Sequence, residues 1–302
     1  MLEARPKVPQ PMLKLLCVLI SVTAIVSGQG VALSSPPLLR HYTEGQKLTY
    51  HMNGINENWH YEIQADGIVE RDSDGTYFED YGWSHFISNG QPVTLSPASL
   101  NLRQQLTLDP NHKPSLPNLS QVDPRLIGPI TDLLTFYVDV WLAVRIGKLT
   151  QPGDHYYFKQ GTPHAWADGN HVLLGQSSID FDFTLKDVNR ASSTVTLIAR
   201  HVPPAETQVK LPAEWMRKPV ADAPNNWVTV QRMKDGKFLG AVGKETFNDE
   251  IVLSLSDGRI VSATMDNRVQ TVERECADSN VTECGKPRPH FIRRQIEISL
   301  ER

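Results

Sequence analysis

The residues best suited to metal chemistry are three histidines and an aspartate in one polar segment. His155, His164, Asp168 and His171 offer imidazole and carboxylate groups, which are ligands that Zn²⁺ takes in proteins. A working site also needs fixed geometry, and a proline and an Asp-Gly-Asn triplet give this segment the composition of two turns. We therefore interpret the histidines as hydrated loop residues, keep His164, Asp168 and His171 as weak candidates for metal ligands, and expect no cofactor.

Motifs for other kinds of catalysis are absent from the sequence or unspecific. The sequence contains no Gly-x-Ser-x-Gly motif, no phosphate-binding glycine loop and no dinucleotide fingerprint. Asp132 and Asp139 are seven residues apart and share one face of a predicted helix, but a solvated or capped pair explains them equally well. The 34 acidic residues offer many pairs that could reach the spacing of about 5–10 Å that glycoside hydrolysis needs. On balance, the sequence favours a function other than catalysis.

The cysteines have a structural interpretation. Cys276 and Cys284 flank a polar, loop-like segment, and the third cysteine, Cys17, lies in an apolar run near the start. In an exported chain two nearby thiols normally pair. The seven residues between them do not match the Cys-x-x-Cys spacing of redox or metal pairs. We predict a structural disulfide.

The N-terminal residues have the layout of a secretory signal peptide. Basic residues precede an apolar run from Leu13 that ends in small residues near Gly28, which predicts a signal peptide over 1–28 and a spacer over 29–40. The run is shorter than the ~18 residues that span a bilayer core, so no transmembrane span is expected in the mature chain. The predicted location is exported, either periplasmic or extracellular.

Composition limits the partners and the number of domains. The formal net charge of -4 argues against nucleic acid or an anionic membrane surface as a partner. Residues 41–302 are long enough for one large β-rich domain. The five prolines of the 203–226 segment leave open a division into two lobes. Asn118 and Asn280 match glycosylation acceptor spacing.

One helix is predicted over 129–146. Proline is tolerated at the first helical position, here Pro129, and Gly147 follows the last helical residue. Apolar residues occupy nearly all sides of this segment, so the helix must be buried. Its three charged residues argue against a membrane span.

Alternating apolar and polar residues predict strands along the rest of the chain. Leu48, Tyr50 and Met52 share one face of the first strand, and the final strand alternates from Ile292 to Leu300. We expect separate strands over 238–247, 250–256, 259–265 and 269–275, with Asp257-Gly258 as a two-residue hairpin loop. The predicted fold class is mainly β: an antiparallel curved sheet or open barrel with one buried apolar helix.

The first strand also carries a resemblance. Its pattern Tyr42-x-x-Gly45-x-x-Leu48-x-Tyr50 resembles the opening strand of several families of exported bacterial proteins of unknown function. Some of these are similar to lipoprotein carriers. The resemblance implies a curved half-barrel and identifies no functional residues.

An aromatic-lined curved sheet over an apolar helix can leave an apolar cavity. We therefore expect an exported envelope or secreted binding protein for an apolar ligand, such as a lipid, or for a partner chain. The candidate binding residues are Phe136, Tyr137, Trp141 and Trp83. If the helix only fills the core, the chain is a non-catalytic structural envelope protein, and a secreted hydrolase with dispersed catalytic residues is the third alternative.

Overall fold

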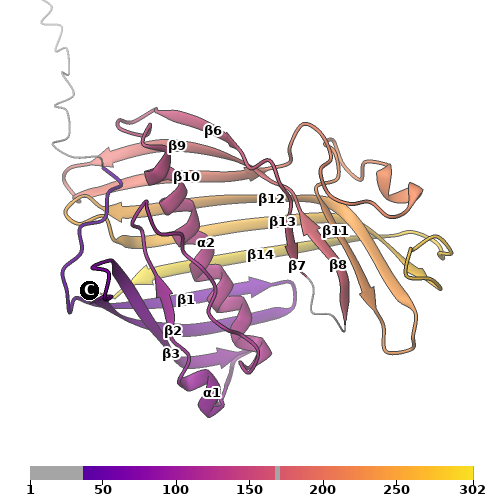
Figure 1. Ribbon diagram of the computed structural model, residues 1–302, viewed down its shortest axis with the longest axis horizontal. Helices are drawn as coiled ribbons and strands as arrows, with labels where there is room; N and C mark the ends of the chain where they lie inside the picture. The colour runs from indigo at the N-terminus through magenta and orange to yellow at the C-terminus, as the bar shows by residue number, and fades with distance from the viewer. Residues whose placement is uncertain (1–36, 167–170, 302) are drawn as a thin grey trace, which may run out of the picture. The chain divides into compact units, whose positions relative to one another are not determined.

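A large antiparallel sheet, open at both ends, dominates the fold (Figure 1). The computed structural model describes residues 37–166 and 171–301, which lie in one compact unit. The main path of the sheet runs β4-β3-β2-β1-β14-β13-β12-β10-β9-β6, and β5, β7, β8 and β11 are attached beside it. The predicted fold class is confirmed. The predicted signal peptide and the beginning of the predicted spacer lie outside the described residues.

The strands have these bounds: β1 Lys47–Asn56, β2 Trp59–Arg71, β3 Tyr77–Ser88, β4 Gln91–Pro92, β5 Gln104–Leu106, β6 His155–Lys159, β7 His164–Trp166, β8 Val172–Ser177, β9 Asp180–Asn189, β10 Thr194–Val202, β11 Trp227–Arg232, β12 Phe238–Ser254, β13 Ile260–Cys276 and β14 Arg288–Leu300. The helices are α1 Pro97–Leu100, α2 Pro124–Ile146 and the 3₁₀ helix η1 Glu214–Arg217.

Period-two alternation determines which face of the sheet is buried. Leu48, Tyr50 and Met52 of β1 are all buried on one face, as predicted. On β14, Ile296 and Ile298 are buried beside them, because β14 pairs with β1 in antiparallel register. The same face of the sheet carries α2 (Figure 1).

Strands β12 and β13 correct the predicted meander. The four shorter strands expected over 238–275 are two continuous strands of 17 residues each. The polar residues that suggested breaks after Phe247 and after Met265 lie opposite each other, since Asn248 pairs with Asp266 in the register. A hairpin connects the two strands at the predicted place, but its loop is longer than the predicted two residues: the Ser254 amide bonds the Arg259 carbonyl, and only Gly258 of the Asp257-Gly258 pair has a positive φ, of 72°.

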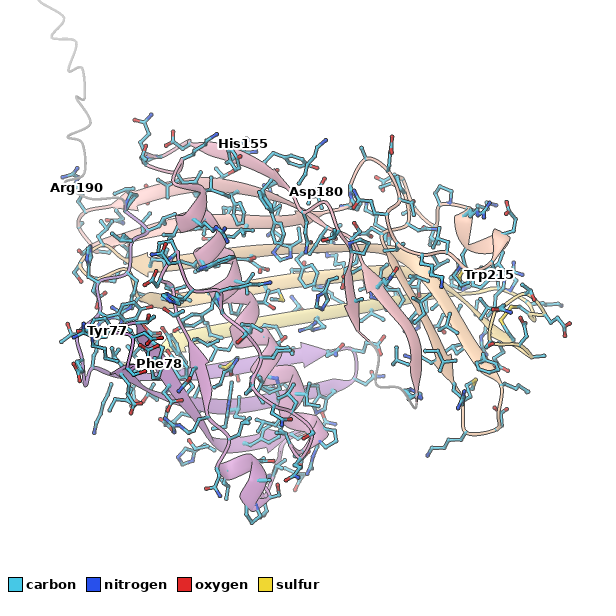
Figure 2. The ribbon with its side chains drawn as sticks, viewed as in Figure 1. Tyr77, Phe78, His155, Asp180, Arg190 and Trp215 are labelled. Atoms are coloured by element: carbon cyan, nitrogen blue, oxygen red, sulfur yellow. A yellow bond between two sulfur atoms is a disulfide. The ribbon has the colours of Figure 1, made fainter. Side chains whose placement is uncertain are left out.

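The two long strands contribute to two separate cores from opposite faces. Ile251 and Leu253 of β12 pack into the larger cluster beneath α2, the helix-side core. Val242 lies an odd number of residues away, points to the other face and packs into a smaller cluster, the disulfide-side core. Trp215, at the rim of this second core, lies at the opposite end of the sheet from Tyr77 (Figure 2).

Helix α2 starts earlier than predicted. It begins at Pro124 rather than Pro129, with Asp123 as the N-cap, whose side chain accepts a hydrogen bond from the Arg125 amide. Its C-terminal end is as predicted, since Gly147 closes the helix in the left-handed conformation. By length and composition α2 could cross a membrane, yet more than half of its most apolar stretch is buried inside the protein.

The proline-rich 203–226 segment packs on the disulfide-side core. It contributes Val209, Ala213 and Met216, which lie against Val242 and Val281. The Trp215 indole donates a hydrogen bond to the Val281 carbonyl at 2.8 Å. The predicted bridge between Cys276 and Cys284 closes the loop that carries Val281.

Candidate functional site

The four aromatic residues predicted to bind a ligand all lie in the helix-side core. Phe136, Tyr137 and Trp141 come from α2 and Trp83 from β3, and each is at most 4 % exposed. The Tyr137 hydroxyl donates to Glu79, and the Trp141 indole donates to the Asp109 carbonyl at 3.0 Å. These contacts attach α2 to the sheet and to the segment that follows β5.

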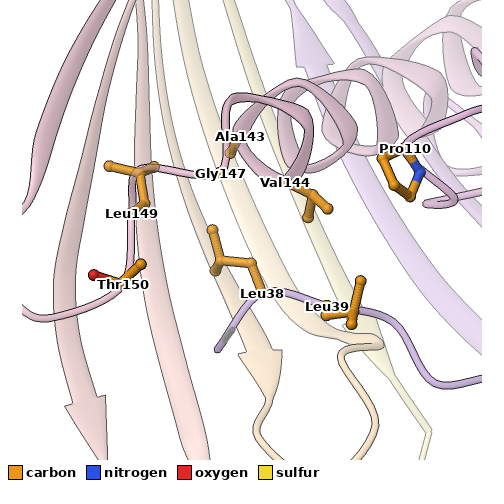
Figure 3. Close-up of a pocket in the computed structure, with 8 residues that line it drawn as sticks. All are labelled: Leu38, Leu39, Pro110, Ala143, Val144, Gly147, Leu149 and Thr150. Atoms are coloured by element: carbon orange, nitrogen blue, oxygen red, sulfur yellow. The ribbon is translucent and has the colours of Figure 1, made fainter. Parts of the chain in front are cut away.

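An apolar pocket of about 160 Å³ lies at the C-terminal end of α2 (Figure 3). It forms where the last turn of the helix meets the start of the described chain and the loop before β6. Its lining residues are Leu38, Leu39, Pro110, Ala143, Val144, Gly147, Leu149 and Thr150. Only Thr150 brings a polar side-chain atom. An apolar cavity of about 150 Å³ is large enough to hold benzene, so the pocket suits one ring or a short branched aliphatic group.

The pocket brings together residues that are far apart in the sequence. Leu38 and Arg40 are 3 % and 5 % exposed, so this end of the predicted spacer belongs to the core. Arg40 holds the segment through its bond to Glu79 and through the Asp257 carbonyl at 3.1 Å. Gly147 turns the chain at the end of α2, which brings Leu149 to the other wall.

Beneath α2 the core contains acidic residues, and Glu79 is the best satisfied of them. Its side chain is 1 % exposed and accepts from Arg40 Nε at 2.8 Å and from the Tyr81 hydroxyl at 2.9 Å. Tyr137 is a third donor. Burial, followed by the nearby Glu79 charge, raises the phenol pKa of Tyr81 and of Tyr137 well above its usual range.

Asp132 is the first of the two α2 aspartates. It is 1 % exposed, accepts from the Tyr61 hydroxyl at 2.7 Å and is paired with Arg294 of β14. Burial raises the pKa of Asp132, and the Arg294 charge opposes that rise. The Tyr61 ring lies over Gly54, where a Cβ would approach the ring to 2.0 Å, so glycine leaves room for this tyrosine.

Asp139 is the second α2 aspartate, and it lies close to His201 of β10 and Asp249 of β12. The His201 Nε2 lies 2.8 Å from Asp139 Oδ1, and one ligand atom of each residue lies within 4.8 Å of those of the other two. All three side chains are buried. The aspartates that share one face of α2 therefore reach different strands and different partners.

Burial shifts the pKa values throughout this cluster. It raises the pKa of Asp139 to about 7 and lowers that of His201. It raises the pKa of Asp249 well above the usual range, and the charge of Asp139 adds to that rise. The imidazole ring is enclosed by Phe181 and Phe247, whose centroids lie 4.6 and 4.8 Å from its own.

The histidines singled out from the sequence lie elsewhere. His155 on β6 contacts Asp182 of β9, and His171 bonds the Arg232 carbonyl through Nδ1 at 2.9 Å. His164 pairs with Ser177 on β8, and Asp168 lies outside the described residues. Within the described chain, three potential metal ligands gather only at Asp139, His201 and Asp249.

Sequence reasoning missed His201, Asp249, Glu79 and Arg294. A signal for them was present: each occupies an apolar-face position of a strand with period-two alternation. His201 continues the buried series of Val195, Leu197 and Ala199. A polar residue at such a position must find a buried partner.

Comparison with known proteins identifies no related family, protein or structure. No protein-family model matches the chain, and neither the curated proteins nor the solved structures give a significant match. The resemblance of the first strand to exported bacterial proteins stays a prediction.

Proposed function

We propose that this chain is an exported binding protein that receives an apolar group in the pocket at the C-terminal end of α2. The observation that carries the proposal is the lining itself, which consists of aliphatic groups from Leu38, Val144 and Leu149 and their neighbours. Removing an apolar group from water into such a lining contributes about 25 cal/mol per Å² of buried surface. A ligand end or partner side chain the size of a phenyl ring fits the volume.

Two further features support export and binding over catalysis. The Cys276–Cys284 bridge is of the kind that persists in oxidising compartments. The carboxyl groups of Asp139 and Asp249, which a hydrolase could use, are fully buried, so a polymeric or peptide substrate has no path to them in this conformation. The pocket, by contrast, is lined by partly exposed residues such as Val144 and Thr150.

The test is a methyl NMR titration of the labelled protein with toluene. Saturable shifts should appear at the leucine and valine methyls of the pocket, namely those of Leu38, Leu39, Val144 and Leu149. Val144→Phe fills the space and should remove the saturable shifts.

Val138→Phe is the matched control. It makes the same change on the same helix, at a residue that is also partly buried but does not line the pocket. This variant should bind toluene as the wild type does. If the wild type shows no saturable shift, or if Val144→Phe binds unchanged, the pocket is not a binding site and the helix only fills the core.

A further inference from the structure

The Asp139–His201–Asp249 cluster has the composition of a metal site rather than of an ordinary hydrogen-bonded core. Its donors come from three separate elements, α2, β10 and β12, and meet within 4.8 Å. Asp249 and Phe247 are on the same face of β12, and His201 lies directly opposite Phe247 in the register. The sheet thus places His201 diagonally beside Asp249, and α2 brings Asp139 over both.

The Asp139 and Asp249 carboxyl groups lie within hydrogen-bond reach of each other. Apart from that contact, several buried atoms of the cluster have no hydrogen-bond partner among the described residues. These are Oδ2 of Asp139, Nδ1 of His201 and both carboxylate oxygens of Asp249. A buried polar atom without a partner loses its interaction with water and gains nothing in return. The Glu79 side chain, which lies in the same core, has three donors. The surrounding protein therefore satisfies Asp249 far less well than Glu79.

The charge of the cluster also suits a cation. Burial raises the pKa of both Asp139 and Asp249, so without a counter-charge the pair holds a proton, and Arg294, the arginine nearby, is already paired with Asp132. One divalent cation neutralises both carboxylates and leaves the imidazole as a neutral ligand. Buried ionised groups are otherwise tolerated only when they are paired or bound to a metal.

We infer that Asp139, His201 and Asp249 bind a structural divalent cation, with Zn²⁺ the best-matched ion. Imidazole and carboxylate together suit Zn²⁺, whereas Ca²⁺ takes six to eight oxygen ligands. A tetrahedral ion with metal–ligand bonds of about 2.0–2.2 Å holds its ligand atoms about 3.3–3.6 Å apart, so His201 Nε2 and Asp139 Oδ1, which lie 2.8 Å apart, would move apart by less than about 1 Å on binding. The ion would fasten α2 to the sheet.

The experiment measures the metal content of the whole protein, purified without chelators and also refolded with excess Zn²⁺ or Co²⁺. We expect one equivalent per chain after gel filtration, and Co²⁺ should give the visible absorption of nitrogen and oxygen ligation. Because the site is buried, a chelator should remove the ion slowly from the folded protein and at once after unfolding. Rapid release from the folded protein would assign the metal to surface histidines and overturn the inference.

Two variants localise the ion. Asp249→Asn keeps the size of the side chain and removes its charge, and it should lower the affinity by at least about 10-fold. Asp180→Asn is the control, since Asp180 is a buried aspartate on β9 that bonds Tyr157. It should keep one equivalent. Absence of bound metal in the wild type under both conditions, or equal affinity of Asp249→Asn and the wild type in competition with a chelator, would overturn the inference. If Asp249→Asn does not fold, the stoichiometry and release rate of the wild type decide.

Discussion

The helix-side and disulfide-side cores share β12 and β13 but differ in what they bury. The larger core beneath α2 encloses acidic groups, among them Glu79, Asp132 and Asp139, within aromatic and aliphatic packing. The smaller core is built from aliphatic residues and closed by a disulfide. A large core can afford polar groups because many apolar contacts offset their desolvation, whereas a small one needs a covalent closure.

The largest effect should come from leaving a buried acid without its counter-charge. Arg40→Met removes the cation from Glu79, with both side chains at most 1 % exposed in the pair. We expect the free energy of unfolding to fall by about 3–5 kcal/mol, as for other broken buried ion pairs. Urea denaturation measures it. The double variant Arg40→Met with Glu79→Gln should regain part of the loss, and a double variant as unstable as the sum of the two single changes would contradict the pairing.

The corresponding test of the disulfide-side core is to remove its disulfide. Replacing Cys276 and Cys284 by serine opens a short loop, and the chain-entropy model gives a loss of about 2–3 kcal/mol. The loss should appear as a lower denaturation midpoint, while toluene binding at the distant pocket stays unchanged. Loss of that binding would show that the two cores are not independent.

A smaller effect is expected at the start of α2. Asp123→Ala removes the side chain that accepts from the Arg125 amide at 3.0 Å, and a lost N-cap costs about 0.5–2 kcal/mol. Hydrogen bonding from Arg125 lowers the pKa of Asp123, so this stabilisation is present above the unfolded pKa and is lost as pH falls through the folded one. The difference in stability between wild type and variant should shrink on acidification. A difference that is constant down to pH 2 would contradict the cap.

The smallest expected effect is a change in the pH at which the buried tyrosines ionise, and it is measured by absorbance. Burial raises the phenol pKa of the core residues Tyr50, Tyr61, Tyr81 and Tyr137 above the usual range, and that of Tyr157, at the sheet edge, to about 12. A raised pKa means that ionisation opposes folding, so stability falls as pH rises above about 10. Absorbance at 295 nm should show these four core phenols ionising only when the protein unfolds. Early, reversible ionisation of these phenols would contradict their burial.

Much of the architecture could be predicted from the sequence, because it depends on local patterns. The alternation in β1 and β14, the hairpin at Gly258 and the end of α2 at Gly147 are all features of a few neighbouring residues. The start of α2 was misplaced since Asp123-Pro124 and Gly128-Pro129 are both start signals. Pro129 is accommodated in the second turn of the helix, where the residue four positions earlier, Arg125, is exposed to solvent.

The rest depends on tertiary pairing. Asn248 and Asp266 have turn-forming side chains, yet they lie opposite each other within two unbroken strands. The Asp139 cluster joins residues that are 62 and 48 positions apart along the chain, and single-sequence periodicity does not report which polar positions meet. Period-two alternation shows that His201 is buried but not what it contacts.

The most direct test of the proposed binding function is a crystal structure of the protein soaked with toluene. The account predicts a ring between Leu38, Val144 and Leu149 at the end of α2, with the helix in place and the disulfide-side core unchanged. A structure in which these side chains close the space and toluene is absent, or bound elsewhere, would contradict it.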